Sequence, residues 1–370
     1  MTSPVWDYRR EYEAERQEIL AVVDQTFRSG RLVLGDRVRS FEAEFAAHCR
    51  VDHGVGVNSG TDALVVGLRA LGLNRGDEVI TVANTAVATV AAIVTAGGTP
   101  RFVDIDPCTY LMDVDRLDAV MTPRTRCIVP VHLFGQCVDM ARVTAIAASQ
   151  GIRVLEDCAQ STGAESFGRR AGSMGDAAAF SFYPTKVLGA YGDGGMVVTA
   201  HGAVANRARR LRMYGMDPQG CAGEHGYNSR LDEVQAAILH VRLRRLSAYI
   251  SRRQELARKY DRGLEETGLQ LPATRAGNTH VYYNYVVRHR ERDRVVRELA
   301  ECGVTVAVHY PRPVHRMPAY ASPAYPEGAL PETERAAREV FSLPMYPSMT
   351  DAEHDHVCEV LCDVCRRLAP

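Results

Sequence analysis

The stretch Ala177-Ala-Ala-Phe-Ser-Phe-Tyr-Pro-Thr-Lys186-Val-Leu-Gly-Ala-Tyr-Gly-Asp-Gly-Gly195 places an apolar run, one lysine and a glycine-rich turn next to one another. The apolar run predicts a buried strand, and the glycines allow the backbone to pass close to a neighbouring segment. Lysine side chains are normally exposed. Lys186 is nevertheless one of two lysines in the chain, beside Lys259, while the other Lys/Arg positions are all arginine. Lys186 is therefore a candidate reactive amine.

Size and composition narrow the class of protein. The 370 residues predict two domains, and 46% hydrophobic with 24% charged residues is typical of a globular protein. The net charge of −1 argues against nucleic acid as a partner. The charged N-terminus lacks the apolar core of a signal peptide, and the most apolar stretch, residues 86–96, is too short to span a bilayer. We therefore expect a cytoplasmic protein without a membrane segment.

The ten cysteines are scattered without a disulfide framework, which favours a reducing compartment. The closest group is Cys358, Cys362 and Cys365. Their spacing could supply metal ligands, but it also places three small side chains on one face of a helix. We favour the packing interpretation and predict no metal site.

Short β-rich runs alternate with helical patterns over the first two thirds of the chain, which predicts an α/β domain with a mainly parallel sheet. Seven strands are expected, at residues 55–58, 78–82, 99–105, 127–133, 153–157, 177–182 and 195–199. A period near 3.6 predicts one helix through Val38, Phe41 and Phe45, and another through Leu64 and Leu68. Their apolar faces would cover the sheet.

The pattern changes after residue 230, where apolar residues at helical spacing predict one long helix over residues 231–260. Ser229 and Asp232 form a plausible capping box at its start. This helix would lead from a large domain, residues 1–250, into a smaller α+β domain, residues 251–370. Strands at 281–287 and 304–310 and a helix at 294–302 are expected there. The N-terminal segment is a candidate to pack on this smaller domain.

A possible phosphate site lies in Val55-Gly-Val-Asn-Ser-Gly60-Thr61-Asp62, which runs from a predicted strand into a helix. Backbone N–H groups at a helix start attract anions, and the Thr61 hydroxyl could assist. The alternative is an ordinary capped turn, because Ser, Thr and Asp often cap helices. The segment lacks the GxGxxG spacing of a dinucleotide fold.

A carboxylate ends the apolar strand in Val154-Leu-Glu-Asp157-Cys-Ala-Gln160. A buried charge is costly unless it is paired. A protonated pyridinium nitrogen would be a suitable partner, because an aspartate beside it keeps the ring cationic and able to accept electrons. Gln160 could hydrogen-bond the ring hydroxyl or cover the ring. Alternatively, Asp157 caps the turn that follows.

Together, these segments predict a site for pyridoxal 5′-phosphate, with Lys186 as its covalent anchor. Ligands of open α/β sheets collect beyond the carboxyl ends of the strands, where all these motifs fall. Ser181 offers a second hydroxyl to the phosphate. The aromatic surroundings of Phe182 and Tyr183 would favour the neutral, nucleophilic form of the lysine.

From about residue 30 to residue 346 the chain resembles the DegT/DnrJ-type sugar aminotransferases, which are fold-type-I pyridoxal-phosphate enzymes. The resemblance rests on the segments already quoted and on others. These are Ser29-Gly-Arg-Leu-Val-Leu-Gly35, Gly226-Tyr-Asn-Ser-Arg230-Leu-Asp-Glu233, His309-Tyr-Pro-Arg-Pro-Val-His315 and Ser342-Leu-Pro-Met-Tyr346.

The resemblance implies roles for individual residues. Lys186 would anchor the cofactor and catalyse, and Asp157 would contact the pyridinium nitrogen with Gln160 beside it. Phosphate contacts would come from Gly60, Thr61 and Ser181. By the same resemblance, Asn228 would reach the phosphate of the neighbouring subunit, so a homodimer with two shared active sites is expected.

The family's usual substrate is a keto sugar linked to a nucleoside diphosphate, aminated by L-glutamate. Tyr183, His309, Tyr310 and His315 are similar to the subgroup that aminates C-3 of dTDP-linked 6-deoxyhexoses for amino-sugar and antibiotic biosynthesis. They are our substrate-side candidates, although both histidines could be turn residues beside prolines. The implied mechanism is ping-pong: glutamate leaves as 2-oxoglutarate, the cofactor becomes pyridoxamine 5′-phosphate, and the keto sugar then receives the amine.

One position departs from the family pattern. Where Ala86 stands, the family generally has an aromatic ring that stacks on the cofactor. Its loss removes a flat apolar wall, so other groups hold the ring or the pocket takes a different sugar.

Three alternatives remain open. One is the related dehydratase branch, against which Lys186 argues because histidine replaces the lysine there. Another is an aminotransferase for a cyclitol ketone or for a C-4 keto sugar. The third is a non-catalytic regulatory protein on the same fold.

Overall fold

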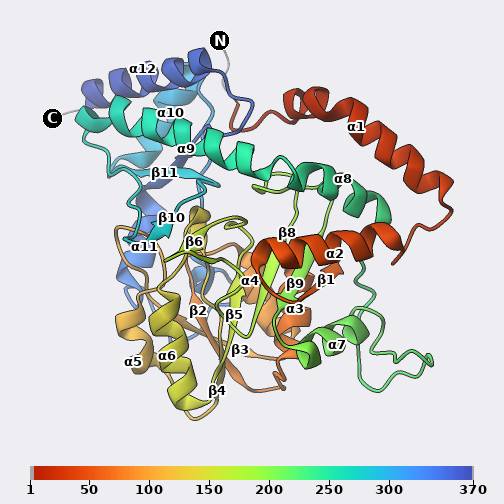
Figure 1. The fold of residues 1–370 in the computed structure, drawn as a ribbon. Helices are drawn as coiled ribbons and strands as arrows, with labels where there is room; N and C mark the ends of the chain where they lie inside the picture. The colour runs from red at the N-terminus through yellow and green to blue at the C-terminus, as the bar shows by residue number, and fades with distance from the viewer. Residues whose placement is uncertain (1–3, 369–370) are drawn as a thin grey trace.

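The computed structural model describes residues 4–368, and its centre is a seven-stranded sheet in the order β1-β9-β8-β5-β4-β2-β3. Only β9 runs against the others. Figure 1 shows the sheet in the lower body of the molecule. The predicted α/β domain with a mainly parallel seven-stranded sheet is confirmed. The strands are β1 (His53–Val57), β2 (Glu78–Val82), β3 (Thr99–Val103), β4 (Thr125–Ile128), β5 (Arg153–Asp157), β8 (Ala177–Ser181) and β9 (Gly195–Thr199).

Two strands end at least two residues earlier than the sequence predicts. β3 stops at Val103, after which Ile105 forms only a single bridge. β4 stops at Ile128 because Pro130 has no N–H with which to continue the ladder. The Pro130 carbonyl instead accepts from the Asp157 N–H at 2.9 Å, and a short 3-10 helix, η2 (Leu133–Gly135), follows.

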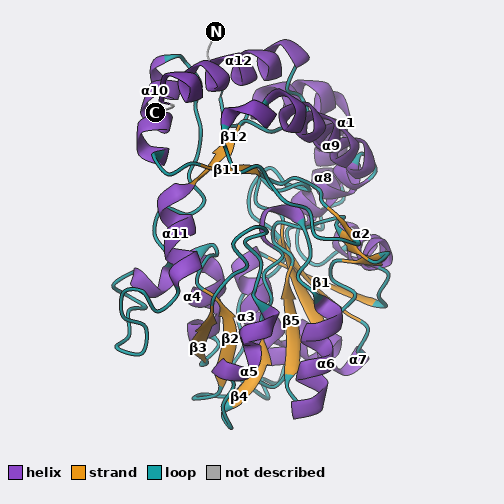
Figure 2. Cartoon of the chain, turned by 90° about the vertical axis from the view of Figure 1, so that its left-hand side faces the viewer, coloured by secondary structure: helices purple, strands orange, loops and turns teal. Residues whose placement is uncertain are grey.

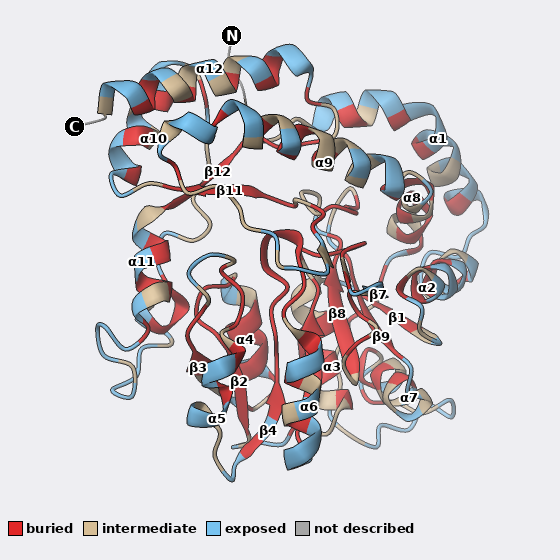
Figure 3. Cartoon of the chain, turned by 60° about the vertical axis from the view of Figure 1, so that its left-hand side comes forward, coloured by how far each residue is buried: buried red, intermediate tan, exposed pale blue. Residues whose placement is uncertain are grey.

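Helices cover both faces of the sheet, and consecutive residues of β8 show why. Ala178 and Phe180 belong to one core cluster, whereas Ala177 and Ala179 belong to another on the opposite face. Figure 3 shows these strands as buried. The predicted helices are confirmed as α2 (Asp36–Cys49) and α3 (Gly60–Ala70). The other helices of this body are α4 (Val87–Thr95), α5 (Leu117–Val120), α6 (Met140–Gln150) and α7 (Gly202–Leu211).

The single helix predicted over residues 231–260 is wrong, because the structure has two helices there. α8 (Glu233–Leu243) and α9 (Leu246–Gly263) are separated by a tight turn in which the Arg245 N–H donates to the Arg242 carbonyl. α9 leads towards the second body, which is visible above the sheet in Figures 1 and 2.

The predicted capping box is also wrong. Asp232 is the N-cap residue of α8 but makes no side-chain cap hydrogen bond. The Ser229 hydroxyl instead donates to Asn58 Oδ1 at 3.1 Å, since it lies beside the end of β1. Tertiary contacts have therefore replaced the local cap.

The second body pairs β11 (Tyr285–Arg288) with β12 (Val340–Leu343) in antiparallel fashion. α10 (Arg292–Glu301), α11 (Pro331–Glu339) and α12 (Asp351–Leu368) accompany this pair. The predicted helix is present, but the first predicted strand begins late. The predicted strand at 304–310 is reduced to one bridge, between Ala307 and Ser342 of β12. The division at residue 250 stays a prediction.

The three neighbouring cysteines lie in or against the core of this second body, whereas the N-terminal helix packs mainly on α8. Cys365 belongs to its core, and Cys358 and Cys362 pack against that core, as the packing interpretation requires. The N-terminal helix α1 (Tyr8–Arg28) packs on α8, and Trp6 contacts both this core and the core of the sheet. No helix within residues 4–368 combines the length and apolarity needed to cross a membrane. A separate three-stranded sheet has the order β10 (Asn278–Thr279), β6 (Glu165–Ser166), β7 (Arg169–Arg170).

Replacing Phe45 by alanine should destabilise the large body. Its ring packs edge-on against Phe180 and Phe182, with centroids 4.9 and 5.1 Å away, and is fully buried. We expect Phe45→Ala to lower the free energy of unfolding by about 3–5 kcal/mol in denaturant titrations. Phe167→Ala, at a ring that is 73% exposed, serves as the control and should change it by only about 0.5 kcal/mol. Equal effects of the two substitutions would contradict this account of the core.

Candidate active site

The turn after β8 lies directly against the start of α3. A Cβ atom on Gly195 would stand 2.2 Å from the Ser59 carbonyl oxygen, and one on Gly60 would stand 2.5 Å from the Ser181 Cβ. Both positions therefore require glycine. This contact brings the Ser181 hydroxyl next to the first residues of the helix.

The start of α3 has the form of a capped helix that still offers free N–H groups. The Ser59 hydroxyl accepts from the Asp62 N–H at 3.1 Å, which confirms the cap considered in the sequence. The first N–H groups of a helix have no partner within it, so those of Gly60 and Thr61 remain available beside Ser181. The cap and the anion cradle are thus compatible on one turn.

Asp157 lies at the end of β5 with 4% of its surface exposed. Its Oδ1 accepts from the Ala159 N–H at 3.1 Å, and its Oδ2 accepts from the Thr89 hydroxyl at 2.8 Å. Burial raises the pKa of this carboxyl, while the bonds from Thr89 and Ala159 and the nearby Lys186 act in the opposite direction. Both direct partners are neutral, so the carboxylate has room for a cationic one.

Gln160 connects this strand end to two other segments. Its Oε1 accepts from the Phe134 N–H at 2.7 Å, and its Nε2 donates to the Tyr310 hydroxyl at 2.9 Å. Tyr310 comes from the segment before α11, so Gln160 fastens the second body to the carboxyl edge of the sheet. Burial raises the pKa of the Tyr310 phenol, which keeps this hydroxyl neutral.

Lys186 is half-buried, and its Nζ lies 4.6 Å from the centre of the Tyr283 ring. Tyr283 comes from the loop before β11, and its hydroxyl lies 3.0 Å from the Thr185 hydroxyl. Sequence reasoning missed Tyr283 and Thr89. The tyrosines at 282, 283 and 285 fall in or beside the predicted strand at 281–287, and Thr89 falls in the apolar stretch at 86–96, so neither belongs to a recognisable site motif.

Two of the four substrate-side candidates, His309 and Tyr310, lie in the buried cluster around Lys186, Asp157 and Gln160. The other two, Tyr183 and His315, lie outside it. His309 bonds Ser342 Oγ through Nδ1 at 2.8 Å, and burial, reinforced by Lys186, lowers its pKa from 6.5 to about 4. Tyr310 is bonded to Gln160, as described. Tyr183 is 51% exposed at the mouth of the site.

His315 is placed elsewhere. It is buried beneath α11, where its Nε2 lies 3.2 Å from Glu334 Oε1 and its ring lies beside Phe102. The structure therefore does not bring His315 together with Lys186. Asn228 is exposed on the loop before α8, next to the Ser229 that bonds Asn58.

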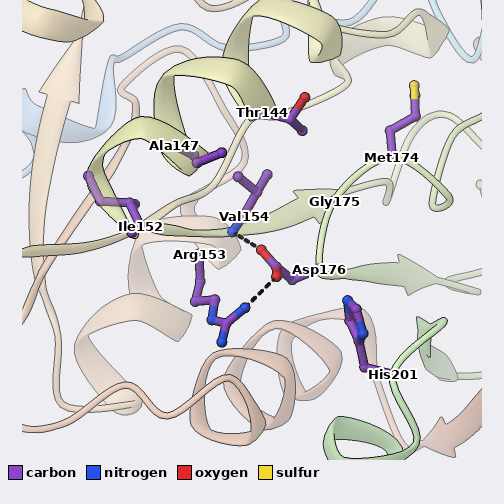
Figure 4. A pocket seen from close by; sticks show the side chains of 11 residues that line it. Thr144, Ala147, Ile152, Arg153, Val154, Met174, Gly175, Asp176 and His201 are labelled. Carbon is purple, nitrogen blue, oxygen red and sulfur yellow. Dashed lines mark hydrogen bonds and ion pairs between the residues drawn. The ribbon is translucent and has the colours of Figure 1, made fainter.

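A separate hollow of about 480 Å³ opens at the opposite, amino-terminal end of the parallel strands, next to α6 (Figure 4). Arg153 and Asp176 form a 2.8 Å ion pair there, and Asp176 also accepts from the Val154 N–H. These charged groups satisfy one another. The hollow is therefore distinct from the cluster around Lys186.

Without a ligand, Asp157 should cost the protein stability. Because burial raises its pKa in the folded state, ionisation opposes folding, and stability is lost as the pH rises through the folded-state pKa. Asn at 157 can accept from the Ala159 N–H and donate to Thr89, whose proton can turn towards Thr85. We expect Asp157→Asn to stabilise the ligand-free protein by on the order of 1 kcal/mol at neutral pH.

Thermal and denaturant unfolding across pH 4–8 measures this effect. The gain should shrink towards low pH, where the wild-type carboxyl becomes protonated. Asp176→Asn, which breaks a paired carboxylate, is the matched control and should destabilise. If the ligand-free Asp157→Asn variant were less stable than wild type at neutral pH, the conclusion that the Asp157 charge lowers the free energy of unfolding would be refuted.

Known proteins resemble the chain over nearly its full length. Residues 13–362 match the DegT/DnrJ/EryC1/StrS aminotransferase family. The dTDP-3-amino-3,4,6-trideoxy-alpha-D-glucose transaminase of Micromonospora megalomicea subsp. nigra is 50% identical over 370 residues, which cover 98% of this chain and 99% of that protein.

Solved structures agree with the sequence match. The crystal structure of S. venezuelae DesV in complex with a ketimine intermediate superposes with a TM-score of 0.97 at 42% identity, covering 100% of both chains. That of NtdA from Bacillus subtilis, with bound cofactor PMP, superposes with a TM-score of 0.91 at 32% identity, covering 99% of this chain and 85% of NtdA. The chain therefore belongs to the DegT/DnrJ/EryC1/StrS aminotransferase family of pyridoxal-phosphate-dependent enzymes.

Proposed function

We propose that the protein transfers an amino group from L-glutamate to the C-3 keto group of a dTDP-linked deoxyhexose, using pyridoxal 5′-phosphate. One observation carries the chemistry: the only half-buried lysine of the sheet body stands with a buried carboxylate at the carboxyl edge of the sheet. The named activity of the Micromonospora relative, a dTDP-3-amino sugar transaminase, supports the substrate class.

The residues present fit the cofactor at both of its ends. Asp157, held by neutral donors alone, matches a protonated ring nitrogen. The N–H groups of Gly60 and Thr61, with the Ser181 hydroxyl beside them, suit the phosphate dianion. Gln160 is fixed by Phe134 and Tyr310, so its amide lies in a defined position near the ring.

When bound, pyridoxal phosphate supplies an aldehyde that takes up the amine and a ring that accepts electrons as the Cα proton leaves. Asp157, as a carboxylate, keeps a proton on the ring nitrogen. The Lys186 amine, once freed by the donor, would take the proton from Cα of the donor as general base and would return it as general acid. Its ammonium form is attracted by the face of the Tyr283 ring.

The substrate side of the site is polar but without a net charge of its own. His309 is neutral at physiological pH because burial lowers its pKa to about 4. Tyr310 is neutral because burial raises its pKa. We assign both, with the exposed Tyr183, to hydrogen bonding of a sugar that carries hydroxyl groups. His315 is bonded to Glu334 and, on this geometry, supports the fold rather than touching the sugar.

A homodimer with shared sites is part of the proposal. Asn228 is exposed, so its amide is free to reach a neighbouring subunit's phosphate. Exposed apolar side chains such as Phe27, Leu32 and Val33 support a covered surface, and Val33 bridges to Asp232, four residues after Asn228. Cytoplasmic location also stays a proposal, and the ten free cysteines support it.

The two lysines allow a direct test of the anchor. Borohydride reduction of the holoenzyme followed by peptide mapping should label Lys186 and leave Lys259 unmodified, because Lys259 is paired with Asp351 at 2.7 Å on the second body. Lys186→Ala should lose transamination, by about three orders of magnitude or more, with the fold retained. Lys259→Ala is the matched control and should keep wild-type turnover. Label at residue 259 alone, or turnover in Lys186→Ala, would refute the assignment.

Nucleotide competition tests the substrate class. Free dTDP should inhibit the keto-sugar half reaction competitively, with UDP and GDP weaker, because only a nucleotide-sugar enzyme recognises the diphosphonucleoside. A panel of dTDP-keto sugars with glutamate, followed by NMR of the product, then identifies the carbon that is aminated. Indifference to all three nucleotides would favour a cyclitol substrate, and amination at C-4 would overturn the C-3 assignment.

A further inference from the structure

Two buried threonines form a chain of hydroxyl groups that ends on the Asp157 carboxylate. The Thr85 and Thr89 hydroxyl oxygens lie 2.8 Å apart, and the Thr89 hydroxyl lies 2.8 Å from Asp157 Oδ2. The two threonines are 2% and 1% exposed, so water does not compete for these bonds. They stand on either side of Ala86, the N-cap residue of α4.

The hydrogen bonds of this chain have a defined direction when Asp157 is ionised. A carboxylate only accepts, so Thr89 must donate its single proton to Asp157. The Thr89 oxygen is then free to accept, and Thr85 is the donor within reach. Two successive donors therefore point towards the carboxylate, and such charge-assisted bonds are stronger than neutral ones.

We infer that Thr89, supported by Thr85, is a positioning residue that holds Asp157 as a carboxylate and leaves its remaining lone pairs facing the cofactor nitrogen. The inference rests on the proposed use of pyridoxal phosphate. Two of the roughly four acceptor sites on the carboxylate are taken, one by Thr89 and one by the Ala159 N–H. Both donors are neutral, so neither supplies a positive charge opposite the Asp157 carboxylate. The protonated ring nitrogen of the cofactor would supply it.

Among the groups around Asp157, the hydroxyl chain is the main one that keeps the buried carboxyl ionised. Burial raises the pKa of Asp157, and the Thr89 bond is the strongest of the opposing influences, ahead of Ala159, Lys186 and His132. The other titratable neighbours, Cys158 and Tyr310, have their pKa values raised by burial and remain neutral. His132 already bonds Glu156 and the Val138 N–H.

The Ala86 position adds weight to this interpretation. The segment before α4 carries no aromatic ring at residue 86, so it offers no stacking wall to the cofactor. Its two threonines instead form the hydroxyl chain that ends on Asp157. The backbone supports them, because the Thr89 N–H donates to the Ala86 carbonyl at 3.1 Å. In this chain the segment therefore contributes to the site through hydroxyl groups.

Binding of pyridoxamine 5′-phosphate to the apoprotein tests the inference without turnover and without Lys186 chemistry. Its Kd is measured by titration calorimetry between pH 5 and 8.5 for wild type, Thr89→Val, Thr89→Ser, Thr85→Val and the double valine variant. Binding should weaken towards low pH, where Asp157 becomes protonated, and we call this part of the profile the acid limb. In Thr89→Val the acid limb should move up by about one pH unit, so that binding at a given pH within it is about tenfold weaker. Thr89→Ser keeps the hydroxyl and should restore the wild-type profile.

The second threonine gives a sharper outcome. Thr85→Val should move the limb in the same direction by less, about threefold in Kd, because it acts through Thr89. The double variant should match Thr89→Val alone, since Thr85 has nothing to act through once the Thr89 hydroxyl is gone. Additive shifts would overturn the series arrangement of the two hydroxyls.

Thr81→Val is the matched control, because Thr81 is equally buried and its hydroxyl donates at 2.9 Å to the carbonyl of Val129, which directly follows β4. It should cost stability without moving the acid limb. A Thr89→Val profile that coincides with wild type, or that moves no more than Thr81→Val, would refute the inference while the proposed function stands. Failure of the wild-type apoprotein to bind pyridoxamine phosphate would refute both.

Discussion

The site depends on the close contact between the start of α3 and the β8–β9 turn. Gly195 lies so near the Ser59 carbonyl, and Gly60 so near Ser181, that neither position has space for a Cβ atom. The contact determines where the helix N–H groups point and where the turn that carries Lys186 leaves the sheet. Cradle and amine are therefore positioned by one backbone approach rather than by their own side chains.

A second constraint is the burial of an acid that the fold does not neutralise. Asp157 is held by an amide and a hydroxyl, although arginine is abundant in the chain. Some other buried carboxylates are paired directly with cations, as Glu11 and Glu15 show with Arg242, whereas Asp104 and Glu233 each accept from three backbone N–H groups. Asp157 has fewer donors than Asp104 and Glu233, one N–H and one hydroxyl, which leaves acceptor sites for a cationic ligand.

The sequence predicts the sheet body well because its signals are local. Apolar strands, turns and helical periods placed all seven strands, and the motifs at Gly60, Asp157 and Lys186 fall at one edge of that sheet. Predictions failed where long-range contacts override local preference. Ser229 bonds Asn58 instead of capping α8, and the strand expected over residues 304–310 forms only one bridge, to Ser342 of β12. Tyr283 and Thr89 were missed because nothing near them in sequence shows what they contact.

The Tyr283 ring next to Lys186 has a consequence for how the two bodies work together. The lysine belongs to the sheet body, whereas the tyrosine belongs to the loop leading into β11. Any hinge movement between the bodies would alter the electrostatic surroundings of the amine before any substrate atom reaches it. The surroundings of this amine are therefore set by both bodies, because the aromatic face beside it belongs to the second one.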